Sequence, residues 1–313
     1  ELLSYLKKLK LFSIAETNNT GTDLETYDLE TYLDNQTGGK GFLNPSKILD
    51  NDLTAPNFFK QENFTFHHGV FVSNAVLFKP NEKIKIRSLT NFYDNHLNFF
   101  VSDSLSYLLP GGLSLSVNEF QNQTQRPQEI FQDLKMDYAI KNNQDLNIRL
   151  QYKNISSSTN SVNQAALINA TQLDAIEQNR LLSTMTYTNK LNEKLVGEID
   201  IKLGGEDLNE NLKIRQDDSA FDNLNQSFLW NSFNIGSDLN LYGKLSENTF
   251  INSYSGWNKS TLELKPLFTN KYKFSNLYSE LELRKQINGF TINGSARIRN
   301  VILDFENQKE NIT

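Results

Sequence analysis

The sequence predicts an all-β protein, an antiparallel transmembrane β-barrel of about ten strands with short periplasmic turns and long extracellular loops. Three observations support this fold class. Apolar residues recur at alternate positions, short polar turns join such segments in pairs, and long polar stretches separate the pairs. Alternation with a period of two is typical of a strand with one apolar and one polar face. Short turns that alternate with long loops are typical of outer-membrane barrels.

The clearest hairpin covers residues 133–154, on either side of a polar turn at residues 141–145. The apolar residues of its two strands are Leu134, Met136, Tyr138 and Ile140 before the turn, and Leu146, Ile148, Leu150 and Tyr152 after it. The residues between them are mostly charged or polar. Each strand therefore has one apolar face and one polar face.

The same pattern recurs around four more short turns, at residues 79–83, 189–194, 244–248 and 285–288. We expect the connections between hairpins to be long, polar and irregular, and they cover residues 95–127, 155–178, 204–226 and 258–274. At most a short helical piece is expected, within residues 164–182. All six prolines fall in expected loops or turns, where proline removes no sheet hydrogen bond.

The apolar faces could contact lipid or could meet each other inside a soluble β-sandwich, because alternation alone does not separate these folds. Two features favour lipid. Charged residues stand at the centres of the polar faces, as in a wide aqueous lumen; they are Asp137, Arg149, Asp200, Glu280 and Glu282. Aromatic residues stand near strand ends, as in the girdles of membrane barrels; they are Phe78, Phe92, Tyr138, Tyr152, Tyr187 and Phe290.

Composition excludes several classes of function. The chain has 313 residues and a net charge of −6, so it lacks the basic footprint of a nucleic-acid-binding protein. No stretch approaches the ~20 apolar residues of a membrane-spanning helix. The absence of cysteine excludes thiol catalysis, cysteine-ligated zinc and iron–sulfur clusters. Residues 1–5 do not resemble a signal peptide and are not preceded by a methionine, so we expect a processed piece or fragment of a longer protein.

Three stretches, residues 71–95 (FVSNAVLFKPNEKIKIRSLTNFYDN), 106–154 and 186–203, resemble the strand–turn–strand segments of TonB-dependent outer-membrane receptors of the Bacteroidetes type. Residues 9–44 resemble the passage from the plug of such a receptor into its first barrel strands. The resemblance divides the chain into residues 1–60, the plug-to-barrel junction with the first long loop, and residues 61–313, barrel hairpins with long outer loops. Receptors of this family close a 22-stranded barrel around a plug, so about ten strands would form part of one.

The resemblance implies a protein of the cell outer membrane that takes up a nutrient by TonB-coupled transport. Its implied partners are the lipid bilayer, a TonB-type energy-coupling protein that acts through a plug not seen in this sequence, and a surface lipoprotein. Ligand would be captured by outer loops at residues 95–127, 155–178 and 204–226, and no single ligand-binding residue is assigned. No enzyme activity, catalytic residue, cofactor or metal is expected. The alternatives are a soluble, secreted β-rich binding or adhesion module and a passive porin-like channel.

Other motifs are weak candidates for chemistry. His67 and His68 are adjacent, so in a strand they point to opposite faces, and with His96 we interpret them as polar surface residues rather than metal ligands. The stretch TGGKGF at residues 37–42 lacks the rest of a phosphate-binding loop. We interpret the repeat at residues 23–32 as exposed loop. The acidic stretch at residues 204–223 lacks the ligand spacing of a calcium loop, and we interpret it as solvated. Its acidic residues are Glu206, Asp207, Glu210, Asp217, Asp218 and Asp222.

Overall fold

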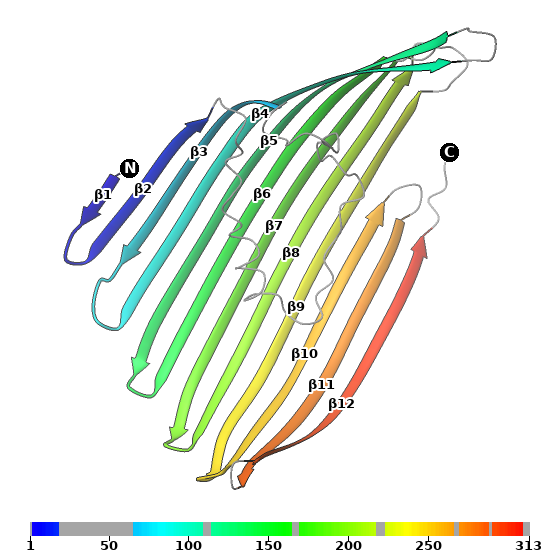
Figure 1. Ribbon diagram of the computed structural model, residues 1–313. Helices are drawn as coiled ribbons and strands as arrows, with labels where there is room; N and C mark the ends of the chain where they lie inside the picture. Colours follow the sequence, from blue (N-terminus) through cyan, green and yellow to red (C-terminus); the bar gives the residue numbers. More distant parts are fainter. Residues whose placement is uncertain are drawn as a thin grey trace.

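The computed structural model describes residues 2–18, 65–108, 114–164, 169–216, 223–265, 269–287 and 290–308. These residues form twelve strands, and each strand pairs antiparallel with the next one in the chain, so a single sheet runs in the order β1 to β12 (Figure 1). The prediction of an all-β antiparallel fold is confirmed, with twelve strands rather than about ten. Among the described residues, no helix is long and apolar enough to span a membrane.

The strands lengthen from the first edge of the sheet toward its middle and then shorten again. Their bounds are β1 Leu2–Tyr5, β2 Leu9–Asn18, β3 Thr65–Phe78, β4 Ile84–Leu108, β5 Ser114–Lys141, β6 Gln144–Gln164, β7 Asn169–Asn192, β8 Leu195–Gln216, β9 Leu224–Ser246, β10 Thr249–Lys265, β11 Thr269–Ile287 and β12 Phe290–Gln308. The predictions for residues 19–64 lie outside the described residues; they concern the repeat at 23–32, the stretch at 37–42 and the first long loop.

The five predicted turns lie between β3 and β4, β5 and β6, β7 and β8, β9 and β10, and β11 and β12, all at one end of the sheet (Figure 1). Asparagine side chains close two of them. Asn81 Oδ1 accepts hydrogen bonds of 2.9 Å from the backbone N–H groups of Lys83 and Ile84, and Asn192 Oδ1 accepts one of 2.8 Å from Lys194. An asparagine that bonds its own turn favours a tight reversal of the chain, which fixes the register of each hairpin.

The expectation of long, irregular connections is wrong for the described residues, which continue as paired strands. β4 and β5 stay paired as far as Leu108 and Ser114, although residues 95–127 had no strand pattern. The described parts of 155–178, 204–226 and 258–274 are likewise mostly strand. At most a short helical piece is expected within residues 164–182, and the described residues 169–182 belong to β7. Backbone pairing with neighbours on both sides overrides the weak local propensities of these segments.

Pro127 corrects the expectation that every proline lies in a loop or turn, because it lies inside β5. Proline has no N–H group and cannot donate to the sheet. The pairing between β4 and β5 is interrupted at this point: it stops at Asp94 opposite Gln128 and resumes at Leu97 opposite Gln125. On its other side Pro127 remains opposite Ser157 of β6. The strand therefore tolerates the proline by giving up pairing on one side only.

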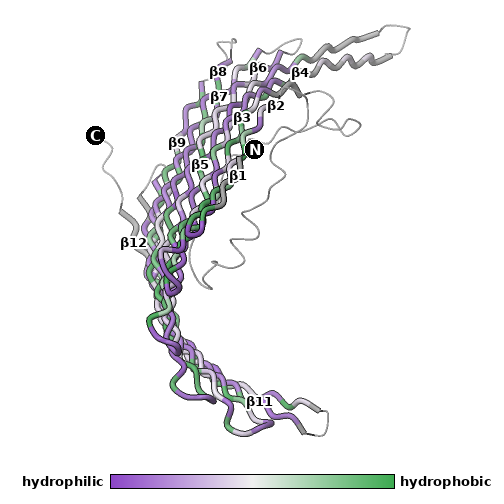
Figure 2. The backbone as a smooth tube through the Cα atoms, turned by 90° about the vertical axis from the view of Figure 1, so that its left-hand side faces the viewer, coloured by the Kyte–Doolittle hydropathy of each residue, from purple (hydrophilic) through white to green (hydrophobic). Residues whose placement is uncertain are grey.

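The sheet is a strongly curved wall, as its side view shows (Figure 2). Side chains crowd together on the concave side of such a wall and spread apart on the convex side. The buried polar residues all share one face by strand alternation and register; they include Asn91, Gln151, Lys153, Asp174, Glu206, Glu210, Asn234, Asp238, Asn240 and Ser260. The opposite face carries most of the exposed large apolar residues. The concave face is therefore the polar one and the convex face the apolar one.

Both edges of the sheet are open among the described residues. β1 pairs only with β2, and β12 pairs only with β11 over its whole length, from Phe290 to Gln308. An open edge presents unpaired backbone N–H and C=O groups that attract another strand. The 19-residue edge of β12 is thus a surface on which further strands can pair.

Candidate functional site

The convex face carries a continuous apolar band next to the short turns. On β8 the outward residues Ile199, Ile201 and Leu203 are 44%, 41% and 42% exposed. The same face of β8 is polar beyond Leu203, where it carries Asp207, Asn209, Asn211 and Lys213. The band thus covers nine residues of β8, from 195 to 203. A tilted strand needs about 9–11 residues to cross the hydrocarbon of a bilayer.

Register carries this band across the neighbouring strands. Ile199 lies opposite Tyr187 of β7 and Leu239 of β9, and both partners face outward with it. Further along, the outward residues include Leu134, Leu150, Leu277, Leu281 and Leu283. A soluble protein seldom exposes so large a contiguous apolar surface, so this face requires an apolar partner.

Aromatic side chains mark both borders of the band. On the border near the turns the outward aromatics are Phe78, Tyr138 and Tyr187, and on the far border they are Phe92, Tyr152, Phe233 and Trp257. The sequence placed Phe92 and Tyr152 near strand ends, but both stand in mid-strand, where the band ends and a polar extension begins. The predicted Phe290 lies in a part of β12 whose side chains are outside the described set.

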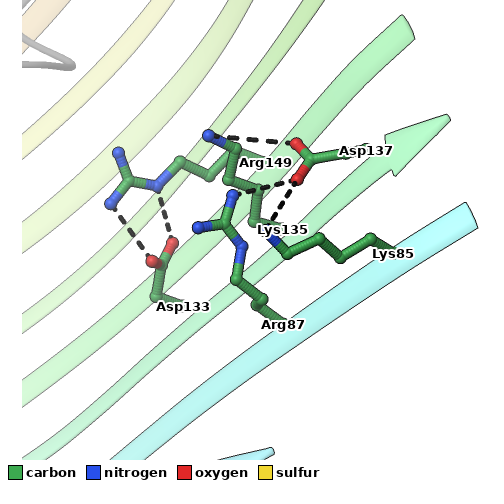
Figure 3. Close-up of polar contacts among 6 residues, drawn as sticks. All are labelled: Lys85, Arg87, Asp133, Lys135, Asp137 and Arg149. Carbon is green, nitrogen blue, oxygen red and sulfur yellow. Dashed lines mark hydrogen bonds and ion pairs between the residues drawn. The ribbon is translucent and has the colours of Figure 1, made fainter. Parts of the chain in front are cut away.

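The concave face of β4, β5 and β6 carries a charged cluster of six residues, Lys85, Arg87, Asp133, Lys135, Asp137 and Arg149 (Figure 3). Arg149 binds Asp133 with two hydrogen bonds, 2.7 Å from Nε to Oδ1 and 3.1 Å from Nη2 to Oδ2. Such a paired contact between a guanidinium and a carboxylate is the strongest form of ion pair. It holds β5 and β6 together side by side at mid-face.

Asp137 is shared by three cations of the same cluster. Its Oδ2 lies 3.0 Å from Arg87 Nη2 and 4.0 Å from Lys85 Nζ, and its Oδ1 lies 3.9 Å from Lys135 Nζ. Only Arg87 is within hydrogen-bond distance. The six residues contain four cations and two carboxylates, which leaves a net charge of +2.

A second network joins β8 to β11 on the concave face. Lys202 Nζ lies 3.0 Å from Asp238 Oδ2, and the hydroxyl of Tyr278 donates to the other oxygen of Asp238. The hydroxyls of Tyr254 and Tyr278 lie 3.1 Å apart, and their rings stack with centroids at 5.2 Å. The carboxylate of Asp238 on β9 thus connects Lys202 of β8 with Tyr278 of β11.

Amide and carboxylate groups extend this network toward the turns. Asn240 Nδ2 donates to Glu198 Oε1 at 3.2 Å and to Asp200 Oδ2 at 3.4 Å, and Thr186 donates its hydroxyl to Asp200. Arg297 of β12 donates a hydrogen bond of 2.6 Å from Nη2 to Oε2 of Glu280 on β11. The face of β8–β11 therefore carries more carboxylates than the face of β4–β6, and the polar wall has a basic side and an acidic side.

The acidic stretch at residues 204–223 is not gathered into one site. Glu206 and Glu210 are buried on the concave face, whereas Asp207 points to the convex side. Gln178 of β7 donates to Glu206. Asp217, Asp218 and Asp222 lie outside the described residues. Strand alternation thus separates carboxylates that are neighbours in the sequence.

His68 and His96 lie directly opposite each other on β3 and β4. His96 Nε2 is 3.1 Å from Asn98 Oδ1, which ties its ring to a neighbour on the same strand. Within the described ranges, no group of three or more His, Cys, Asp or Glu residues is placed to hold a metal ion. The side chain of His67 lies outside the described set.

The charges predicted to face a lumen, Asp137, Arg149, Asp200, Glu280 and Glu282, all lie on the concave face. Sequence reasoning missed the partners that organise them, such as Lys202, Asp238 and Tyr278. Lys202 and Asp238 are 36 positions apart and meet only because β8 and β9 pair with Ile201 opposite Ser237. The one available signal was the alternation that places these residues on the polar face.

Comparison with known proteins gives little. No family model matches the sequence. No curated protein matches it either. Among solved structures, the fold is similar to the ferric yersiniabactin uptake receptor FyuA from Yersinia pestis, with a TM-score of 0.38 and 10% sequence identity. The match covers 76% of this chain and 43% of that receptor, so the chain spans less than half of the receptor's length.

Proposed function

We propose that this chain is part of the wall of a transmembrane β-barrel in the outer membrane, with the convex face against lipid and the concave face around an aqueous lumen. The observation that carries this proposal is the inverted arrangement of the two faces. In a soluble protein apolar side chains are sealed inside and polar ones are outside. Here Ile199, Ile201 and Leu203 are exposed while Glu206 and Asp238 are buried.

The height of the apolar band and its aromatic borders support the same proposal. Nine residues on β8 match the span of a barrel strand, and the aromatic borders correspond to the two interfaces of a bilayer. The soluble sandwich needs a second sheet to cover the apolar face. The described strands instead form one sheet with that face exposed. The hydrocarbon of a membrane would supply the apolar partner that a second sheet supplies in a sandwich.

The open edges of β1 and β12 are part of the proposal. In hydrocarbon each unsatisfied backbone group costs several kcal/mol, so only closed barrels cross a membrane as sheets. Further strands must therefore pair with both edges. With them, the long strands beyond the band would form a wide vestibule on one side of the membrane, opposite the short turns.

We further propose that the complete protein is a receptor that takes up a nutrient by TonB-coupled transport. The resemblance of residues 71–95, 106–154 and 186–203 to the segments of such receptors supports this. The barrel would bind and conduct and carry out no covalent chemistry. A TonB-type protein and a surface lipoprotein would be its partners. A passive porin-like channel is the competing function, since a charged concave face suits it as well.

The lipid-facing assignment can be tested directly because the chain has no cysteine. Single cysteines are introduced at Ile201 on the convex face of β8 and at Thr184 on the concave face of β7. The two positions lie at nearly the same height on the sheet, because Ile201 pairs with Met185, the residue that follows Thr184. In outer membranes, a polarity-sensitive thiol label at position 201 should report an apolar environment and be quenched by nitroxide lipids. The label at position 184 should remain in contact with water. Equal responses at both positions would refute the membrane assignment.

The receptor and the passive channel are separated by conductance. The full-length protein is reconstituted in planar bilayers. A gated receptor should show no steady conductance, because its passage opens only on energy coupling. A constant open current would favour the porin-like channel.

A further inference from the structure

The basic side of the concave face contains three like charges in a direct row. Arg87 of β4 lies opposite Lys135 of β5, and Lys135 lies opposite Arg149 of β6. These three residues are called the cationic row. Like charges placed directly opposite each other on neighbouring strands are destabilising. A sheet keeps such a row at a cost in stability, so its presence requires a reason.

The neighbouring carboxylates neutralise the row only in part, because two carboxylates face four cations. Asp133 has both of its oxygens engaged by Arg149. Asp137 accepts a hydrogen bond from Arg87 only, and the ammonium groups of Lys85 and Lys135 lie beyond hydrogen-bond distance at 4.0 Å and 3.9 Å. Each ammonium carries three donors. Both ammonium groups are thus held near the same carboxylate, and neither has a hydrogen-bonded acceptor among the residues that the structure describes.

The row is accessible from the concave side. The side chains of Lys85, Arg87 and Lys135 are 38%, 45% and 39% exposed. Along the strands, carboxylates on both sides of the row limit the extent of its positive charge. Lys153, farther from the turn, lies 3.5 Å from Glu129 and is already paired, and Asp145 stands at the turn beside Ala139. The excess positive charge is therefore confined to the cluster drawn in Figure 3.

We propose that the cationic row, with Lys85, binds an anion that carries at least two carboxylate or phosphate groups, and that the cargo of the barrel is anionic. The second part of this inference rests on the proposed function. A ligand with two acceptor groups spaced by a few bonds can take donors from Lys85 and Lys135 together and relieve the repulsion along the row. Arg87 offers the remaining N–H groups of its guanidinium for paired recognition of one acid group.

Carboxylates on the other side of the concave face would keep an anion away from β8 and β9. Across β7, the concave face carries Glu198 and Asp200 on β8, with Asp238 on β9. Lys202 pairs with Asp238 there, but Glu198 and Asp200 leave an excess of negative charge, so an anion is repelled from β8 and β9 and attracted to β4–β6. The ligand is thereby confined to one side of the lumen.

The test uses the full-length protein in neutral phosphatidylcholine vesicles, so that lipid headgroups supply no net negative charge. Inorganic pyrophosphate and citrate are the probes, and binding is measured by equilibrium dialysis. The double variant Arg87→Gln/Lys135→Gln should lose at least tenfold in affinity for both probes. The affinity of the unaltered protein should fall as salt is raised, because the site is partly exposed.

The matched control is Lys190→Gln/Lys244→Gln, which removes two positive charges from exposed positions near the turn ends of β7 and β9. It should bind both probes like the unaltered protein. An equal loss in this control would overturn the inference, because net charge alone would then explain binding. The inference would also be overturned if the unaltered protein bound neither pyrophosphate nor citrate.

Vesicle flotation separates this result from the proposed function. A protein that floats with the vesicles but binds neither probe overturns the anion site and leaves the membrane assignment standing. A protein that binds the probes in detergent but does not float supports the anion site and overturns the membrane assignment, and with it the claim about cargo.

Discussion

The side chain of Tyr278 lies over Gly256 on the neighbouring strand, in the space that any side chain at position 256 would occupy. The two residues are directly opposite each other on β11 and β10. A Cβ atom at Gly256 would come closest to Asp238 Oδ1, and would lie 2.5 Å from the Tyr278 hydroxyl and 2.7 Å from its ring. The hydrogen bond from Tyr278 to Asp238, and through Asp238 the ion pair with Lys202, therefore depends on glycine at this position.

Gly256→Ala should destabilise the protein by about 1–3 kcal/mol, the usual cost of forcing extra atoms into a well-packed site. The methyl group would push Tyr278 aside and break its hydrogen bond to Asp238. The free energy of unfolding can be measured in vesicles by urea titration, followed through tryptophan fluorescence of Trp230 and Trp257.

Gly294→Ala is the matched control, because a Cβ atom at Gly294 meets nothing within 4 Å. It should leave the free energy of unfolding within about 0.5 kcal/mol of the original, as is usual for a surface substitution. If the two glycines respond alike, backbone effects rather than the packing of Tyr278 explain the loss.

Ile201→Arg should destabilise the protein in a bilayer by about 2–4 kcal/mol, the cost of an arginine on the lipid face near the midplane of a membrane barrel. Asn209→Arg places the same side chain on the same face of β8, beyond the apolar band. There the cost should be about 0–1 kcal/mol, because the charge reaches water. Urea titration in vesicles measures both. Similar costs at the two depths would contradict the lipid-facing band.

The hairpins could be predicted because the apolar band imposes a period of two and the turns contain asparagine. Within residues 134–152 the outward residues on both sides of the turn are apolar, so the pattern is visible in the sequence. Residues 155–164 (ISSSTNSVNQ) belong to the same strand, β6, but both of their faces are polar. No alternation can appear there. The pairing of these residues with β5 and β7 was invisible in the sequence for that reason.

For the polar site, the sequence predicts which residues lie on the polar face of each strand but not which of them contact each other. Alternation places Asp137 and Arg149 on the wet side of their strands. Their neighbours depend on register between strands, which one turn fixes only for its own hairpin. The cationic row needs the pairing of β4 with β5 as well, and these two strands belong to different hairpins. Contacts between hairpins therefore require the structure.

Asp137→Asn should strengthen binding of pyrophosphate to the cationic row. The change removes the carboxylate that Lys85, Arg87 and Lys135 share, and one charge at ~4 Å in a water-like medium is worth about 1 kcal/mol, or roughly fivefold in affinity. Equilibrium dialysis measures the change, and Asp94→Asn, a carboxylate on the opposite face of β4, is the control. Unchanged or weaker binding in Asp137→Asn would count against the anion site.

The stability of the protein should depend on pH through Asp174. This residue lies on the concave face of β7, beyond the apolar band that ends at Leu181. Burial raises the pKa of Asp174 above its ordinary value of 3.8, and a hydrogen bond of 2.9 Å from Gln172 opposes the rise. Its Oδ1 has no hydrogen-bond partner among the described residues. The folded state therefore holds the protonated form more readily than the unfolded state does.

The sign of the effect follows from this order of pKa values. Below the unfolded pKa, near 3.8, both states are protonated and Asp174 costs nothing. As pH rises through that value and then through the higher folded pKa, the unfolded state loses its proton first and stability falls. Asp174→Asn should remove this fall, so that the variant is more stable than the original protein at pH 7 and comparable to it at pH 3.5. Urea midpoints across this range measure the difference. A profile for Asp174→Asn parallel to that of the unaltered protein would show that burial of this carboxylate does not control stability.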